Sequence, residues 1–86
     1  MPGPEQLALV VVINGQPFAV EANVNAPIRT VVEKALAESN NTGQPAENWE
    51  LRNEVGALLE LAKKVGDFRF PADTKLFLSL KAGVGG

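Results

Sequence analysis

Residues 7–24 read LALVVVINGQPFAVEANV, two apolar runs separated by the dipeptide Asn14-Gly15. The first run is rich in β-branched residues, which are frequent in strands. An Asn-Gly pair between apolar runs is typical of a type I′ turn, because both central residues of that turn need a positive φ. The stretch therefore predicts a β-hairpin with strands from Leu7 to Ile13 and from Gln16 to Val24.

A two-residue loop fixes the register of a hairpin, so the two faces of this one can be assigned. When Ile13 pairs with Gln16, one face carries the cross-strand pairs Val11 with Phe18, Leu9 with Val20 and Leu7 with Ala22. We expect this apolar face to join the core. The opposite face carries Ala8, Val10, Val12, Ala19 and Glu21. The first strand is apolar on both faces, which predicts a central position in the sheet.

A helix is predicted next, over Pro27–Glu38. Asn25 is a plausible cap, and Pro27 is tolerated in a first turn. The apolar residues then follow helical spacing, at Ile28, Val31, Val32, Ala35 and Leu36, while charged residues fall on the other side. We expect this stripe to pack on the sheet.

Two short strands are predicted after the helix. Trp49 to Arg52 alternates, with Trp49 and Leu51 expected to point inward. A turn at residues 53–56 separates this strand from a second one, expected over residues 57–61.

The last third of the chain predicts a tucked turn and a final strand. We expect Val65, Phe68 and Phe70 to hold a helical turn or loop under the core. Residues 75–81 then alternate clearly as a strand. Its leucines, at positions 76, 78 and 80, point one way, and Phe77 with Ser79 points the other way.

Length and composition limit the class of protein. The chain has 86 residues, 45% of them hydrophobic and 21% charged, which is typical of one small globular domain. The longest apolar run, Leu7 to Ile13, is far below the ~20 residues that cross a bilayer. A net charge of −2 with mixed signs gives no footprint for nucleic acid. With no secretion pattern, we expect a cytoplasmic protein without membrane or nucleic-acid partners.

Two absent residue types exclude most catalytic sites. The sequence has no Cys and no His, so it cannot build thiol nucleophiles, thiolate metal sites or Ser-His pairs. No P-loop or GxGxxG phosphate cradle occurs, and the ten acidic residues are scattered singly. We therefore expect a protein that is not an enzyme and that holds no metal or cofactor.

The C-terminal segment Lys81-Ala82-Gly83-Val84-Gly85-Gly86 contains three glycines. Glycine resists ordering, so we expect this tail to be extended, mobile and able to enter a narrow active site. Its terminal carboxylate would then be presented to another enzyme. An ordinary frayed end is the competing interpretation, since termini are often rich in glycine.

The order of these elements resembles that of ubiquitin over roughly residues 7–86, and especially that of the bacterial ubiquitin-like proteins found with activating, conjugating and deubiquitinase-like enzymes. The resemblance rests on Ile28-x-x-Val31 at the helix start, Leu59-Glu60, the segment from Val65 to Phe70, and Leu76-x-Leu78 leading to Gly85-Gly86. Each match is weak alone, but their order is specific.

The resemblance implies an α+β fold: a ubiquitin-like β-grasp, with a mixed four- to five-stranded sheet and one helix across one face. The first and last strands would be parallel neighbours at its centre. Residues 1–6 would be a disordered leader, 7–80 the β-grasp domain and 81–86 a flexible diglycine tail. The expected core is Leu7, Leu9, Val11, Val20, Ile28, Val32, Leu36, Leu51, Leu59, Leu76 and Leu78.

In function, the resemblance implies a protein modifier. An activating enzyme would adenylate the carboxylate of Gly86, carry the chain as a thioester and, with a conjugating enzyme, join it to amines of target proteins. A deconjugating peptidase would reverse the reaction. Gly85 and Gly86 would be the conjugation residues, and Lys81, Ala82, Gly83 and Val84 would contact the activating enzyme.

This sequence also departs from ubiquitin. The tail is one residue longer, and Ala82-Gly83-Val84 replaces the arginine-containing series. Phe77 and Ser79 stand where ubiquitin has part of its hydrophobic recognition patch. On the helix-free face, we expect Val10, Val12 and Phe77 to form a candidate recognition patch, provided that the first and last strands are neighbours.

Two other functions stay open from the sequence. Sulfur carriers of thiamine and molybdopterin biosynthesis share the β-grasp and the diglycine, but convert the adenylate to a thiocarboxylate. The predicted strand over residues 57–61 and the tucked turn favour the modifier, because many sulfur carriers shorten this region. The other open function is that of a β-grasp interaction module that is never conjugated.

Overall fold

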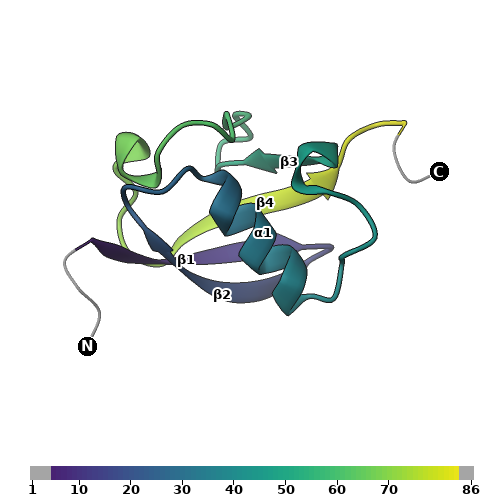
Figure 1. Ribbon diagram of the computed structural model, residues 1–86, viewed down its shortest axis with the longest axis horizontal. Helices are drawn as coiled ribbons and strands as arrows, with labels where there is room; N and C mark the ends of the chain where they lie inside the picture. Colours follow the sequence, from purple (N-terminus) through teal and green to yellow (C-terminus); the bar gives the residue numbers. More distant parts are fainter. Residues whose placement is uncertain (1–4, 84–86) are drawn as a thin grey trace.

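The computed structural model describes residues 5–83. Its sheet has the strand order β2-β1-β4-β3, in which β1 and β4 are parallel and the other pairs antiparallel. One helix lies across one face of this sheet (Figure 1). The elements are β1 (Gln6–Ile13), β2 (Gln16–Asn23), α1 (Arg29–Glu38), the 3-10 turn η1 (Ala46–Asn48), β3 (Trp49–Arg52), the 3-10 turn η2 (Val65–Phe68) and β4 (Thr74–Leu80). The expected α+β β-grasp architecture, with four strands, is confirmed.

The hairpin has the predicted turn and register. Asn14 and Gly15 have φ values of 52° and 80°, as a type I′ turn requires. Ile13 pairs with Gln16, and the pairs Val11–Phe18, Leu9–Val20 and Leu7–Ala22 follow. The face assignment is therefore confirmed, and β1 lies centrally because β4 pairs along its other edge.

The predicted helix start is wrong. The helix begins at Arg29, with Ile28 in the cap position and no side chain capping it. The amide groups of Ile28 and Arg29 instead donate to the carbonyls of Lys63 and Leu61, at 2.8 and 3.0 Å. The free amides of a helix start need such partners, and a distant loop supplies them here in place of Asn25.

The helix ends in a Schellman motif, one residue of which adopts a left-handed conformation. Asn40 has a φ of 60°. The amide of Asn41 donates to the carbonyl of Leu36 at 2.8 Å, and that of Asn40 to the carbonyl of Ala37 at 3.3 Å. This motif sends the following loop back toward the end of β4.

The strand predicted over residues 57–61 is also wrong. Within residues 5–83, this segment makes only an isolated bridge between Arg52 and Leu58, with the amide of Leu59 donating to the carbonyl of Leu51 at 2.8 Å. The carbonyls of Leu61 and Lys63 bind the helix start, which draws the chain away from the edge of the sheet after only one bridge.

The core lies between the helix and the inner face of the sheet. Ten of the eleven predicted core residues are buried, including Leu9 and Leu36. Leu7 is the exception and is half-buried, because β4 pairs with β1 only from Leu9 onward. The tucked turn η2 is confirmed: Val65 is fully buried, and the rings of Phe68 and Phe70 stack 5.1 Å apart against the core.

The N-terminal boundary differs slightly from the expected one. β1 begins at Gln6, and the carbonyl of Glu5 accepts a hydrogen bond from the amide of Val24 at 2.7 Å. The rest of the predicted leader, residues 1–4, lies outside the described residues. In the described part of the chain, no helix has the length and apolar character needed to cross a membrane.

Candidate functional site

The base of the C-terminal tail follows directly from a central strand. β4 ends at Leu80, and the amide of Lys81 donates to the carbonyl of Asn48 at 2.9 Å. Ala82 and Gly83 are exposed, and Gly83 has a φ of 85°. The backbone that leads to the diglycine is therefore anchored at Lys81 and accessible at Ala82 and Gly83. Of the predicted tail residues, Val84, Gly85 and Gly86 lie outside the described residues.

The candidate recognition patch, Val10, Val12 and Phe77, lies on the face of the sheet opposite the helix. The parallel register sets Val12 beside Phe77 and Val10 beside Lys75. Phe77 is 41% exposed, and both valines are half-buried. Because β1 and β4 are neighbours, Val12 and Phe77 lie side by side, as the patch requires. The role of the patch in recognition stays a prediction.

Further residues extend this patch and form its rim. Pro17 pairs with Val12, and Ala19 pairs with Val10, so the apolar surface continues onto β2. On the other side, Arg52 pairs with Phe77 and forms an ion pair with Glu50 at 2.8 Å. The patch thus has an apolar centre and a charged rim.

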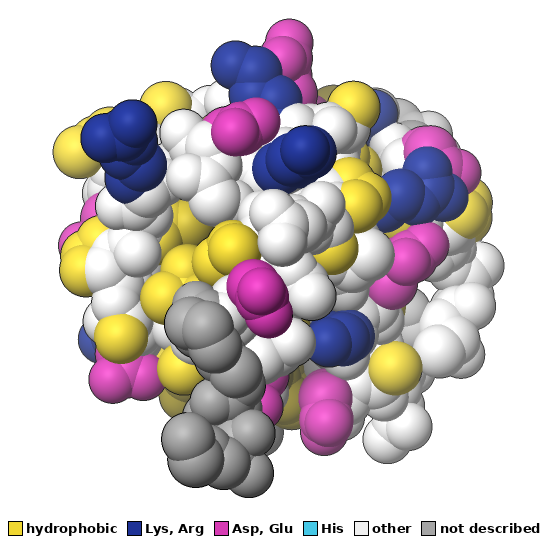
Figure 2. Space-filling view, turned by 60° about the vertical axis from the view of Figure 1, so that its left-hand side comes forward, with side chains coloured by type: hydrophobic (Ala, Val, Ile, Leu, Met, Phe, Trp, Pro, Cys, Tyr) yellow, Lys and Arg dark blue, Asp and Glu magenta, His cyan; other side chains and the backbone are white. Residues whose placement is uncertain are grey.

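Charges of both signs are interspersed elsewhere on the surface. Figure 2 shows one end of the molecule, where Lys and Arg side chains alternate with Asp and Glu around small apolar areas. Such a face has no single-sign field that would attract a polyanion. Within residues 5–83, no group of three acidic, His or Cys side chains lies close enough to hold a metal ion.

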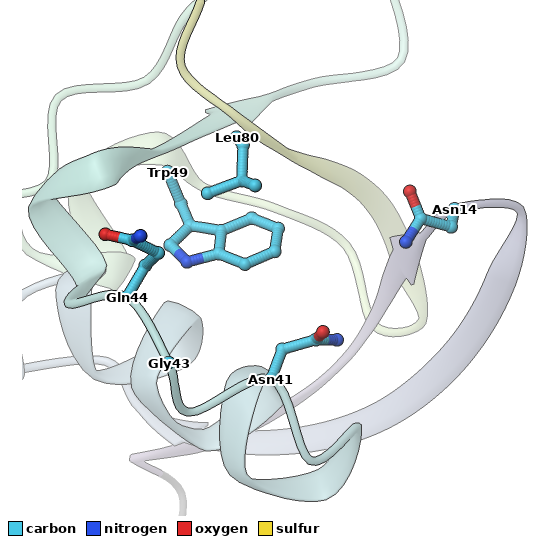
Figure 3. A pocket seen from close by; sticks show the side chains of 6 residues that line it. All are labelled: Asn14, Asn41, Gly43, Gln44, Trp49 and Leu80. Atoms are coloured by element: carbon cyan, nitrogen blue, oxygen red, sulfur yellow. The ribbon is translucent and has the colours of Figure 1, made fainter. Parts of the chain in front are cut away.

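A pocket beside the tail was not predicted from the sequence. It has a volume of about 260 Å³ and is lined by Asn14, Asn41, Gly43, Gln44, Trp49 and Leu80. Figure 3 shows the indole of Trp49 and the side chain of Leu80 at this pocket, with the polar side chains arranged around it. The pocket joins the hairpin turn, the loop after α1 and the ends of β3 and β4, which are distant in sequence. Only the single tryptophan marked it in the sequence.

Leu80 explains why the pocket is open. The register places Leu80 opposite Trp49, on the same side of the sheet as the buried Leu76 and Leu78. It is nevertheless 39% exposed, because it lies beyond the part of β4 that pairs with β1. The core therefore ends in a partly apolar depression from which the tail emerges.

Solved structures with this fold belong to the ubiquitin-like class. The chain is similar to a designed protein based on ubiquitin, with a TM-score of 0.77, 20% identity and coverage of 98% of this chain and 99% of the other. It is also similar to a Caldiarchaeum subterraneum ubiquitin, with a TM-score of 0.73, 21% identity and coverage of 94% and 99%. A ubiquitin-like domain of an Arabidopsis thaliana protein gives a TM-score of 0.72 at 15% identity, covering 91% and 80%. These likenesses show a ubiquitin-like fold.

Sequence comparison gives a nearer relative and a family. The chain is 55% identical over 84 residues to "Uncharacterized protein y4jI" of the bacterium Sinorhizobium fredii, strain NBRC 101917 / NGR234. The match covers 98% of this chain and 65% of the relative, so the chain spans about two thirds of that protein's length. A family profile matches residues 2–86, and the chain therefore belongs to the family described as "Protein of Unknown function (DUF2604)".

Proposed function

We propose that this chain is a ubiquitin-like protein modifier whose active form ends at Gly86. The observation that carries the proposal is the exposed tail base on a ubiquitin-like body: β4, a central strand, leads into Ala82 and Gly83, and the sequence continues to Gly85-Gly86. Six residues, 81–86, can extend roughly 20 Å, enough to separate the reacting carbon from the folded domain.

The proposed chemistry begins with activation of the carboxylate. A carboxylate oxygen of Gly86 attacks the α-phosphorus of ATP, and pyrophosphate leaves, which yields an acyl-adenylate. A cysteine thiolate of the activating enzyme then attacks the carbonyl carbon and expels AMP. Finally, a target amine attacks the thioester, loses a proton and releases the thiolate, which leaves an amide bond.

In this proposal every catalytic group belongs to the partner enzymes. The sequence supports this division, because it contains no His and no Cys. The partners are an activating enzyme, a conjugating enzyme, a deconjugating peptidase and a target protein, and the reaction takes place in the cytoplasm. The patch at Val10, Val12 and Phe77 supports recognition by one of them, since it continues onto β2 and has a charged rim, as protein contact sites often do.

The sulfur carrier is the second candidate for the same activated carboxylate. One of the two features that favoured the modifier, the tucked turn η2, is present, whereas the strand over residues 57–61 is reduced to a single bridge. The two functions share the adenylate and differ in the product, so they are separated by the mass of the reacted chain.

The experiment is an ATP-dependent assay with the cognate activating enzyme, read by non-reducing gel and intact mass. We expect a thioester with the wild-type chain, and a strong reduction or loss with Gly85→Ala or with Gly86 deleted, because a side chain or a shortened tail misplaces the reacting carbon. Both variants should melt at the wild-type temperature.

Three outcomes of this assay are distinct. A sulfur-for-oxygen change in the mass of the chain selects the carrier. An unmodified wild-type chain, in the presence of an enzyme that demonstrably activates carboxylates with ATP, contradicts the proposal. Equal reactivity of the Gly86 deletion contradicts the role of the terminal glycine as the reacting residue.

A further inference from the structure

The pocket beside the tail contains an unpartnered hydrogen-bond donor. Trp49 is 6% exposed, and its indole Nε1 is the one buried side-chain nitrogen or oxygen in residues 5–83 that has no hydrogen-bond partner. A buried donor without a partner is destabilising, because it has lost its hydrogen bond to water without gaining another. In Figure 3 this nitrogen lies on the side of the ring that faces Gly43, between Gln44 and Asn41. We propose that this pocket binds an amide group of the protein that takes up the tail, and that the indole donates to its oxygen.

The lining chemistry favours a neutral ligand group. None of the six lining residues carries a charge. A carboxylate or phosphate placed there would lose its hydration without gaining a cation, which is strongly unfavourable. A neutral carbonyl oxygen accepts from the indole at a much smaller desolvation cost.

The amide side chains supply one further donor and one acceptor. The Nδ2 of Asn41 donates to the hydroxyl of Ser39 at 2.8 Å, which leaves Asn41 Oδ1 without a partner among residues 5–83. The Oε1 of Gln44 accepts from Asn48 Nδ2 at 2.7 Å, which leaves Gln44 Nε2 similarly unused. An amide group, with one carbonyl and one or two N–H bonds, matches this set.

The size of the pocket indicates a single group rather than a metabolite. Its volume of about 260 Å³ lies just below the ~300–1,000 Å³ of small-molecule sites. One Asn or Gln side chain, or one peptide unit of a loop, is the ligand that this space suits. Leu80 adds an apolar wall for its carbon atoms.

Binding requires a small movement of the loop that carries Asn41, Gly43 and Gln44. The indole nitrogen itself has under 1 Å² of accessible surface, so the ligand oxygen reaches it only when this loop shifts. Gly43 is exposed, and a Cβ placed on it would meet no atom within 4 Å. The loop is thus unpacked at the point where it would move.

The position of the pocket indicates which partner would supply the amide. Leu80 lines the pocket and immediately precedes the tail, and Lys81 is bonded to Asn48, the neighbour of Trp49. An enzyme that holds the chain from Lys81 onward therefore lies against the pocket. This identification of the partner rests on the proposed function, whereas the amide site does not.

The test uses the only indole of the chain as a reporter. The full chain, labelled with ¹⁵N, is titrated with N-methylacetamide and, separately, with acetate, while the Trp49 Nε1–H resonance is followed by NMR. We expect a saturable shift with the amide and no saturable shift with acetate. Gln44→Ala should weaken the amide response about fivefold through loss of one donor. Gln16→Ala, which removes an exposed glutamine outside the pocket, should leave it unchanged.

A non-saturable amide response, an equal response to acetate, or wild-type affinity in Gln44→Ala would overturn the amide site. None of these results depends on whether Gly86 is activated, so failure of the site and failure of the modifier proposal are distinguishable. If both hold, Trp49→Phe should raise the KM of the activating enzyme for the chain more than it changes kcat. An unchanged KM would contradict the assignment of the partner.

Discussion

Single residues with a left-handed backbone define the hairpin turn. Gly15 has a φ of 80°, and a Cβ there would meet no atom within 4 Å, so any cost of a side chain arises from the backbone conformation alone. Gly43 offers the same open space without a positive φ. The two glycines therefore differ in backbone conformation but not in the space around an added side chain.

We predict that Gly15→Ala lowers the free energy of unfolding by about 1–2 kcal/mol, because an L-residue resists the left-handed region. Gly43→Ala should leave stability unchanged or raise it slightly, since alanine restricts the unfolded chain. Urea denaturation of both variants measures the difference. Equal effects of the two substitutions would show that the turn is not of type I′ in solution.

At the scale of elements, the start of α1 depends on another segment of the chain. The carbonyls of Leu61 and Lys63 accept from the first helical amides, and no side chain caps the helix. Asn25 was the cap expected from the sequence, but its backbone amide donates a hydrogen bond to Asn23 Oδ1 at 2.8 Å. Local sequence signals therefore point to the right region but to the wrong partner.

We predict that Asn25→Ala changes the free energy of unfolding by under about 0.5 kcal/mol, well below the ~1 kcal/mol of a true cap. Asn23→Ala, its matched control, removes a used acceptor and should cost about 0.5–1.5 kcal/mol. Denaturant titrations give both values. A larger loss for Asn25→Ala than for Asn23→Ala would restore Asn25 as the cap.

The sheet face between β1 and β4 is the second element with a testable role. Phe77 is 41% exposed and lies beside Val12, so its change to Ser should weaken the binding of at least one partner enzyme while shifting the melting temperature little. Val55→Ser, at a residue that is 88% exposed and outside the patch, is the control and should bind as wild type. Titration calorimetry with the activating and conjugating enzymes measures this. Unchanged binding of Phe77→Ser to every partner would remove the patch hypothesis.

Elements whose signals are local were predicted correctly from the sequence. Elements whose bounds depend on contacts between distant segments were not. The register from Ile13 and Gln16 to Leu7 and Ala22 was correct, because a two-residue turn dictates it. The helix start and the strand over residues 57–61 were wrong, because both depend on hydrogen bonds between Leu61, Lys63 and the helix. The Trp49 pocket was not predicted, because its lining residues come from one turn, one loop and two strands that are far apart in the sequence.

At the scale of the whole molecule, the fold brings the base of the C-terminal tail next to the Trp49 pocket. β4 lies between β1 and β3, and the chain leaves the sheet at Lys81 beside the Trp49 pocket. In the proposed function, this body serves as a handle, and Gly86 is the reacting residue. The central claim concerns a covalent bond, so it is tested best by detecting that bond.

Lys81 is the last Lys or Arg in the sequence, so trypsin leaves Ala82-Gly83-Val84-Gly85-Gly86 on any amine to which the chain is joined. The most direct measurement is mass spectrometry of tryptic peptides from native cells, with a search for this remnant on target lysines. The proposal predicts lysines that carry the remnant in wild-type cells and none in cells whose chain lacks Gly86. A chain recovered only with a free carboxylate or a thiocarboxylate, and no remnant on any protein, would contradict it.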